Sequence, residues 1–378
     1  MKIVLNFVPL KSGGGVQVAL DFINSIGVHG KEHKWYLVAS KDTPFEELTL
    51  PDNCNLIRLV GRNIFKRIWF EEVQANELVA SIQPDIIYTQ FGPHWSSVKG
   101  THVVGCAYSN LFYPDVDFWK GYSLFALLKR KLYDVARINR LRKADFVIFE
   151  TEDLADRAVK VRGFEHDRVN YVLPTVSANI GLEVEHEKTK LQCAGISSGF
   201  NLCLISGYAK NKNIETLVRA AAVIKNRHGR GDVRFVFTLP VDHEGARGVM
   251  KMAGELGVTD QVINIGPIPF EGCAEVYRRC DAAILPATLE SFSNNIAEAW
   301  AMEKPLFITD MDWSRSLCKD GAIYIDHNNP EDIATKIINF IDQGAGDVVK
   351  KGTHQLSTYP SSEERFKGYM DIIYKAAR

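Results

Sequence analysis

The most informative segment of this 378-residue chain is Pro286-Ala287-Thr288-Leu289-Glu290-Ser291-Phe292-Ser293-Asn294-Asn295-Ile296-Ala297-Glu298. It follows an apolar run that ends at Leu285 and reads as a buried strand, and it opens a segment with helical periodicity. Open α/β sheets bind their ligands at the carboxyl ends of the strands. We therefore expect this loop to form part of a ligand site.

The residue types in this loop suit a phosphorylated sugar. Ser293 or Asn294 is placed to cap the helix, and the amides that follow form an anion site suited to a diphosphate. Glu290 lies in the loop and Glu298 about one turn into the helix, so the two carboxylates can hold different parts of one ligand. One can accept hydrogen bonds from sugar hydroxyls while the other holds a ribose. Two solvated surface glutamates are the alternative, which the pattern alone leaves open.

On both sides of this segment, apolar strands alternate with helical stretches, which predicts doubly wound parallel sheets of the α/β class. The strands expected in the N-terminal half are residues 2–8, 34–39, 56–59, 86–89, 102–107 and 146–149. Those expected in the C-terminal half are residues 201–206, 233–239, 262–265, 282–285, 306–309 and 322–325.

The alternation stops between the two halves, where residues 178–198 are polar and weakly periodic. A chain of this length exceeds the size of one hydrophobic core, so two domains are expected. We interpret the weakly periodic stretch as the linker with its neighbouring surface. The predicted domains are residues 1–177 and 178–362.

Composition narrows the class of protein. The formal net charge of −1 gives no support to a nucleic-acid-binding protein. The seven scattered cysteines indicate reduced, mostly buried thiols, as in a cytosolic protein. The first residues, MKIVLNFVPLKSGGG, lack the pattern of a signal peptide, and no apolar run approaches the roughly 20 residues of a membrane span. We expect a cytoplasmic protein that contacts a membrane, if at all, at its surface.

The pair Glu290-x7-Glu298, with Ser291-Phe292-Ser293 between, resembles the signature of retaining glycosyltransferases of the GT-B fold, family GT4. The flanking segments Tyr277-x3-Asp281-Ala-Ala-Ile-Leu-Pro286 and Glu298-Ala-Trp-Ala-Met-x2-Pro305 resemble that family's neighbouring motifs, as does Asp326-His-Asn-Asn-Pro330. The resemblance is strong over residues 201–342 and weak in the N-terminal half. It implies two Rossmann-like domains that face a cleft, with a C-terminal helix at about residues 363–377 packing back on the first domain.

The resemblance also assigns roles within the segment. It implies that Glu290 contacts the donor hexose and Glu298 the donor ribose. The other donor-binding candidates of this segment are Ser291, Phe292, Ser293, Asn294, Asn295 and Ile296. The run Ser293-Asn294-Asn295 departs from the family, where Gly-x-Pro is frequent, and the added side chains are expected to narrow the pocket.

A second loop, Ser206-Gly207-Tyr208-Ala209-Lys210-Asn211-Lys212-Asn213, follows the first strand of the C-terminal half. Gly207 permits a close turn, and a lysine at this position can neutralise a phosphate. Lys212 matches the family's basic residue best, and Lys210 is the second choice. Solvated lysines are the alternative. We expect Lys212 and Glu290 to be the catalytic residues, with no metal and no cofactor. The D-x-D spelling at Asp115-Val116-Asp117 lies in an N-terminal loop, and we discount it as a metal motif.

Two N-terminal loops complete the predicted site. Gly13-Gly14-Gly15 precedes a helix without the spacing of a dinucleotide or P-loop motif, and it suits either an anion or simply a tight turn. In the family this loop faces the donor, so Gly14 and Gly15 are candidates. Ser109-Asn110 stands where many members have His-Asp, and we place these two residues on the acceptor side.

The stretch from Trp119 to Lys143 is strongly basic, with aromatic and aliphatic residues interleaved. One interpretation is a helix on an anionic membrane surface, where each basic residue contributes about 1 kcal/mol. The other is an amphipathic core helix with a solvated basic face.

These features together predict a retaining, metal-independent transfer of a hexose from a nucleoside-diphosphate sugar to a glycan or lipid-linked acceptor in cell-surface polysaccharide synthesis. The alternatives are a nucleotide-sugar 2-epimerase of the same fold and a catalytically silent partner subunit that binds sugar nucleotides. No nucleic-acid partner is expected. The predicted location is cytoplasmic, with peripheral attachment to the inner face of the plasma membrane.

Overall fold

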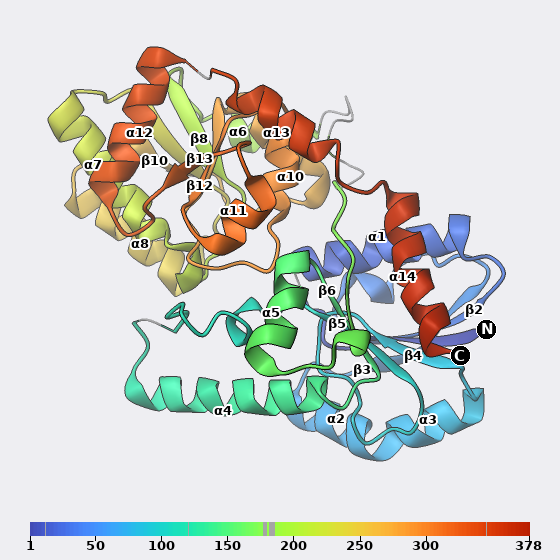
Figure 1. Cartoon of the computed structure of the whole chain (residues 1–378). Coiled ribbons are helices and arrows are strands. Elements are labelled where there is room, and N and C mark those ends of the chain that lie inside the picture. Colours follow the sequence, from blue (N-terminus) through green and yellow to red (C-terminus); the bar gives the residue numbers. More distant parts are fainter. Residues whose placement is uncertain (12, 120, 177–179, 181–185, 345) are drawn as a thin grey trace. The chain divides into compact units, whose positions relative to one another are not determined.

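The computed structural model of the chain describes residues 1–11, 13–119, 121–176, 180, 186–344 and 346–378. The chain forms two compact units (Figure 1). Unit 1 consists of Met1–Thr175 with Pro360–Arg378, and unit 2 of Val176–Tyr359. The boundary expected between residues 177 and 178 lies outside the described residues and stays a prediction.

Unit 1 is built on a seven-stranded parallel sheet with the order β3-β2-β1-β4-β5-β6-β7. Its strands are β1 (Lys2–Phe7), β2 (Lys34–Ser40), β3 (Cys54–Val60), β4 (Ile86–Thr89), β5 (His102–Cys106), β6 (Phe146–Phe149) and β7 (Val169–Tyr171). The six strands expected from the sequence are confirmed. The seventh, β7, was not expected because it has three residues and no apolar run, with Tyr171 exposed at the sheet edge.

Helices cover both faces of this sheet. On one face, α1 (Gly14–His29) packs with α14 (Ser362–Ala376), and the rings of Phe22 and Phe366 lie 5.4 Å apart in the core between them. On the other face, α2 (Ile64–Trp69), the π-helical turn η2 (Phe70–Gln74) and α3 (Ala75–Ile82) form one continuous helical run. The remaining helices are α4 (Leu124–Leu141) and α5 (Glu152–Arg162), with short 3-10 turns η1 (Pro44–Glu46), η3 (Ser109–Leu111) and η4 (His166–Arg168).

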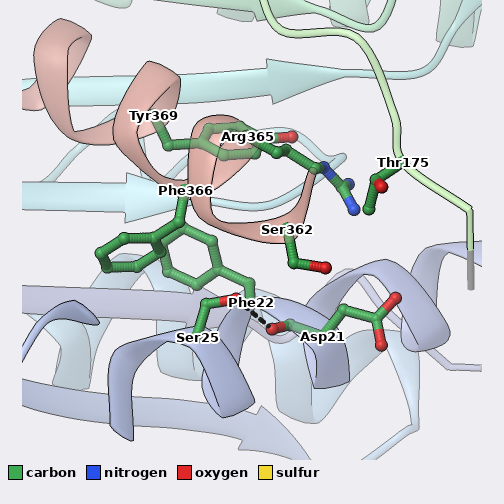
Figure 2. A pocket seen from close by; sticks show the side chains of 8 residues that line it. All are labelled: Asp21, Phe22, Ser25, Thr175, Ser362, Arg365, Phe366 and Tyr369. Atoms are coloured by element: carbon green, nitrogen blue, oxygen red, sulfur yellow. Dashed lines mark hydrogen bonds between the residues drawn. The ribbon is translucent and has the colours of Figure 1, made fainter. Parts of the chain in front are cut away.

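A small cavity between α1 and α14 holds a buried charge (Figure 2). Arg365 is 6% exposed, and its Nε atom has no hydrogen-bond partner among the described residues. Figure 2 shows its guanidinium directed toward Thr175, with Ser362 and Asp21 lining the same cavity. Burial raises the pKa of Asp21 to about 6, and the nearby charge of Arg365 acts against that rise. The cavity therefore lies where the chain leaves unit 1, after Thr175, and returns to it, at Pro360.

Unit 2 contains a six-stranded parallel sheet with the order β10-β9-β8-β11-β12-β13. Its strands are β8 (Phe200–Leu204), β9 (Val233–Phe237), β10 (Val262–Asn264), β11 (Ala282–Leu285), β12 (Leu306–Thr309) and β13 (Ile323–Ile325). Its helices are α6 (Glu187–Cys193), α7 (Ile214–His228), α8 (Glu244–Glu255), α9 (Cys273–Arg279), α10 (Asn294–Ala301), α11 (Asp312–Cys318), α12 (Pro330–Gln343) and α13 (Val348–Leu356), with 3-10 turns η5 (Lys210–Lys212), η6 (Thr259–Gln261) and η7 (Phe270–Gly272). The doubly wound parallel architecture expected from the sequence is confirmed.

One part of the expected linker is helical. Helix α6 begins after His186, whose Nδ1 accepts a hydrogen bond of 3.2 Å from the backbone N–H of Thr189. Only Thr189 and Cys193 of this helix are buried, so its sequence carries too little apolar periodicity to be recognised. Within the described residues, no helix has the length and apolarity needed to cross a bilayer.

Strands β9 and β10 lie on one side of β8, whereas β11, β12 and β13 lie on its other side. The strand order of unit 2 therefore reverses between β8 and β11. Such a reversal separates the loops at the carboxyl ends of the two central strands and opens a ligand crevice. The loops concerned are residues 205–213 and 286–293, which are the two loops that the sequence indicated.

Candidate active site

Asn211 joins the two loops at this crevice. Its backbone oxygen accepts a hydrogen bond of 2.8 Å from the N–H of Thr288, and its side-chain amide donates to the oxygen of Leu289 at 3.2 Å. The same amide lies 3.5 Å from Oε1 of Glu290. Asn211 thereby fixes the turn η5 against the glutamate loop. An asparagine between two lysines carries no motif of its own, so this role could not be predicted from the sequence.

Lys212 and Glu290 form an ion pair between the two loops. The distance between Lys212 Nζ and Glu290 Oε1 is 2.8 Å, and the side chains are 17% and 14% exposed. Each side chain therefore keeps some access to a ligand while it neutralises the other. A ligand with both a diphosphate and sugar hydroxyls matches this pair, because the ammonium donates to phosphate oxygens and the carboxylate accepts from hydroxyls.

Glu298 lies in α10 and is 5% exposed. Burial raises the pKa of its carboxyl to about 7, and a hydrogen bond from the Tyr277 hydroxyl to Oε2, at 3.2 Å, acts against that rise. Tyr277 comes from α9 and is fully buried, so it holds the carboxylate in one position. The sequence contained Tyr277 in a flanking motif but gave no sign of this contact.

Most side chains at the start of α10 pack into the interior of unit 2. Ser293 occupies the predicted N-cap position, although its side chain makes no capping hydrogen bond. Phe292 and Ile296 are buried, and the Phe292 ring lies 6.0 Å from that of Tyr359. Asn295 is buried too, and its amide donates to the oxygen of Ile205 at 3.1 Å. Any contact of Phe292, Asn295 and Ile296 with a donor must therefore come chiefly from their backbone. Ser291 and Asn294 are half-exposed, so their side chains remain accessible.

The loop after β8 leaves room for a close approach. Gly207 is exposed, and no atom lies within 4 Å of the position that a Cβ would take. Beside it, the ring of Tyr208 packs so closely on Gly245 that a Cβ there would lie 2.1 Å from the ring, and the Tyr208 hydroxyl donates to Glu215 at 2.6 Å. Lys210, the second predicted lysine, is exposed at the start of η5.

The N-terminal candidates belong to unit 1. Gly14 and Gly15 begin α1, and Gly13 before them has a φ of 76°, which favours glycine. Asn110 donates a hydrogen bond of 2.9 Å to Oδ2 of Asp134, and Ser109 is buried. Asn110 is thus tied to α4 and fixes the loop. The expected contact of these residues with the donor or acceptor stays a prediction.

Residues 195–370 match the protein family described as "Glycosyl transferases group 1". Curated relatives include the D-inositol 3-phosphate glycosyltransferase of Thermomonospora curvata, 27% identical over 213 residues, which are 53% of this chain and 49% of the relative. The protein of the same name from Nocardia farcinica is 25% identical over 186 residues, 48% of this chain and 41% of the relative. The chain thus spans about half the length of the curated relatives it matches.

Solved structures resemble the whole chain. Sucrose-phosphate synthase from Thermosynechococcus elongatus gives a TM-score of 0.76 at 16% identity, with 99% of this chain and 98% of that chain covered. The Anabaena protein HepE in complex with UDP and glucose gives 0.74 at 16% identity, with 99% and 100% covered. At these identities the likeness shows the fold.

Proposed function

We propose that this protein is a group 1 glycosyltransferase of the GT4 type, which transfers a hexose from a nucleoside-diphosphate sugar to an acceptor. Its residues 195–370 match the family model, and the chain has the GT-B fold. The observation that carries the proposal is the Lys212–Glu290 pair at the strand reversal of unit 2. It offers a cation and a carboxylate at the place where an α/β sheet binds its ligand.

In this proposal each polar group takes one part of the donor. Lys212 and the first amides of α10 stabilise the negative charge that develops on the departing diphosphate. Glu290 holds the hexose hydroxyls and Glu298 the ribose hydroxyls. Lys210 and Gly207 line the rest of the donor site within unit 2.

The reaction proposed is retaining and independent of metal and cofactor. A lysine and helix amides supply the positive charge that a metal ion supplies in other transferases. No protein nucleophile is assigned, so the leaving phosphate takes the proton of the acceptor hydroxyl. HepE is described in complex with UDP and glucose, which makes UDP-hexoses the first donors to test.

The acceptor proposed is a glycan or lipid-linked saccharide used in cell-surface polysaccharide synthesis. The basic stretch that contains α4 favours a lipid-linked acceptor at the inner face of the plasma membrane, because exposed lysines such as Lys129 and Lys131 attract anionic lipids. Lys120 of this stretch lies outside the described residues.

The test is turnover with a panel of UDP-, GDP- and dTDP-hexoses and oligosaccharide acceptors, with nucleoside-diphosphate affinity measured alongside. Transfer with retention of the anomeric configuration supports the proposal. Conversion of the donor to its 2-epimer supports the epimerase instead, and nucleotide binding without turnover of any pair supports the silent subunit.

A further inference from the structure

The helical run from α2 into η2 exposes a row of large apolar side chains. We call this row the α2 ridge, and its members are Ile64, Phe65, Ile68, Trp69 and Val73. Phe65 is 78% exposed and Trp69 59%. Single exposed apolar residues are ordinary, but five within ten positions of one helical run form a patch of the kind that marks an interaction site.

The α2 ridge has no part in the core of unit 1. The opposite side of the same helical run already supplies that packing, through Phe70, Ala75 and Val79. A helix that covers a sheet needs one apolar face, with its other face polar. Here the outer face is apolar as well, which the packing of unit 1 does not explain.

Helix α4 exposes a second apolar face. Six of its large apolar side chains are exposed, namely Leu124, Phe125, Leu128, Leu132, Tyr133 and Val135. Its buried residues are Ile138 and Leu141, both near its C-terminal end. A core helix with a solvated basic face would bury the apolar side chains and expose only the charges, which is the opposite of this pattern.

A buried carboxylate connects the α2 ridge to α4. Glu71 of η2 is 4% exposed and lies 2.7 Å from Arg67 Nε and 3.5 Å from Arg140 Nη1 of α4. This three-residue contact holds the C-terminal end of α4 against η2, and both helices lie on the same side of unit 1 in Figure 1. The helical run that carries the α2 ridge and the C-terminal end of α4 are therefore neighbours in unit 1.

Charge selects the occupant of these apolar faces. Exposed cations outnumber exposed carboxylates along both apolar faces. Arg62 and Lys66 lie beside the α2 ridge together with the acid Glu72, and Lys129, Lys131 and Lys143 lie on or just after α4. We infer that the α2 ridge is an apolar anchor that enters the interfacial layer of an anionic lipid bilayer while α4 lies on the surface beside it. Tryptophan and phenylalanine on an apolar face bordered by lysine and arginine are the composition that binds such interfaces. The inference rests on the lipid contact of α4 in the proposed function and adds the α2 ridge to it.

Trp69 provides a direct readout of insertion. Of the other tryptophans, Trp35, Trp95, Trp300 and Trp313 are buried, and Trp119 is half-buried. With the full chain and vesicles of phosphatidylcholine and phosphatidylglycerol, lipids brominated on the acyl chain should quench the emission of Trp69. A Trp69→Phe variant should still bind the vesicles and lose most of the quenching.

The anchoring itself is tested by vesicle sedimentation. The double variant Phe65→Ser, Trp69→Ser should weaken vesicle binding about tenfold or more. It removes two large apolar side chains whose transfer from water into the lipid interface would stabilise the bound state. The matched control is Val28→Ser with Leu191→Ser, which removes equally exposed apolar side chains of α1 and α6 and should bind like the wild type. Circular dichroism and thermal melts confirm that each variant is folded.

The outcomes separate the two proposals. If Lys129→Glu with Lys131→Glu abolishes binding while the Phe65 and Trp69 variants bind normally and no quenching occurs, the anchor is overturned and the lipid contact of α4 stands. If the wild type does not bind anionic vesicles at low salt, both the lipid contact of α4 and the anchor at the α2 ridge are overturned.

If the wild type is instead a dimer in solution that the Phe65→Ser, Trp69→Ser variant converts to monomer, the ridge covers a second copy and the inference is overturned. Transfer to a soluble acceptor tests the glycosyltransferase proposal independently of all three results.

Discussion

Lys212 and Glu290 contact each other directly, with 2.8 Å between Nζ and Oε1, although they come from loops that follow different strands. From the sequence we expected them to bind separate parts of the donor, Glu290 the hexose and Lys212 a phosphate. The structure shows that the pair is formed in the chain itself, held by the hydrogen bonds of Asn211 to the glutamate loop. The ion pair is therefore already formed in the chain without a ligand, and in the proposed function the phosphate and hydroxyls of a donor would bind against it.

The first prediction separates the two members of this pair. Lys212→Met should lower kcat and kcat/KM together by about 100-fold, because its contact with the leaving diphosphate strengthens in the transition state. Glu290→Gln should impair the sugar donor far more than the bare nucleotide, which has no hexose. Steady-state kinetics and calorimetry measure both effects. Lys251→Met, which removes an exposed ion pair with Glu255 on α8, is the control and should behave like the wild type. Intact transfer by Glu290→Gln would remove the hexose contact from the proposal.

The second prediction concerns the pH dependence of nucleotide binding. The pKa of Glu298 is raised to about 7, so its carboxyl is largely protonated below pH 7 and ionised above it. Ribose hydroxyls donate best to the carboxylate, so nucleoside-diphosphate affinity should fall as the pH decreases through 7. Calorimetry between pH 5.5 and 8.5 measures the profile. Glu298→Gln should bind weakly and lose this dependence, and its residual profile corrects for titration of the phosphate. An identical profile in both proteins would contradict the ribose contact.

The third prediction tests Tyr277 as the positioning residue for Glu298. Its hydroxyl stabilises the carboxylate, so Tyr277→Phe should raise the pKa of Glu298 further. The midpoint of the affinity profile should then move to higher pH, while affinity at the alkaline end stays near the wild-type value. Tyr324→Phe removes a hydroxyl that donates to the Lys319 oxygen elsewhere in unit 2 and should leave the midpoint unchanged. An unshifted midpoint in Tyr277→Phe would mean that the hydroxyl does not tune the carboxyl.

The fourth prediction concerns metal. Lys212 and the amides of α10 supply positive charge at the proposed diphosphate position, so transfer should persist in excess EDTA. The measurement is the initial rate with and without chelator at constant ionic strength. A complete loss of activity that Mg²⁺ or Mn²⁺ restores would show that the site needs a cation.

The fifth prediction concerns α4. Binding to anionic vesicles should weaken as salt rises, because the attraction between lysines and lipid headgroups is screened. Reversing Lys129 and Lys131 to Glu should abolish binding at physiological salt. Arg130 is left unchanged because its guanidinium stacks on Trp119 and Tyr122, at 4.6 and 4.0 Å from the ring centroids, so its loss would disturb the fold locally. A vesicle affinity that does not change with salt concentration would contradict an electrostatic contact.

The sequence predicted the sheets well because buried parallel strands such as residues 86–89 and 282–285 are continuous apolar runs with matching structural bounds. It failed where structure depends on contacts distant in the chain. Strand β7 is held by pairing with β6, and α6 by a histidine cap, and neither leaves an apolar pattern. The two loops beside the strand reversal were predicted from their positions at strand ends, and their role in binding a ligand stays a prediction. The direct contact of Lys212 with Glu290 was not predicted, because it requires the placement of β8 beside β11, which sequence spacing does not contain.

The position of α14 also bears on how the protein is made. Phe366, Tyr369, Met370 and Ile373 belong to the same core as the strands β1 and β2. A ribosome therefore produces all of unit 2 before it releases the segment that completes unit 1. Unit 2 is continuous and can close as it emerges, whereas unit 1 must wait with part of its core exposed. We therefore expect the first unit to be translated to be the last to finish folding, and in the interval to be the part of the nascent chain with the greater need of a chaperone.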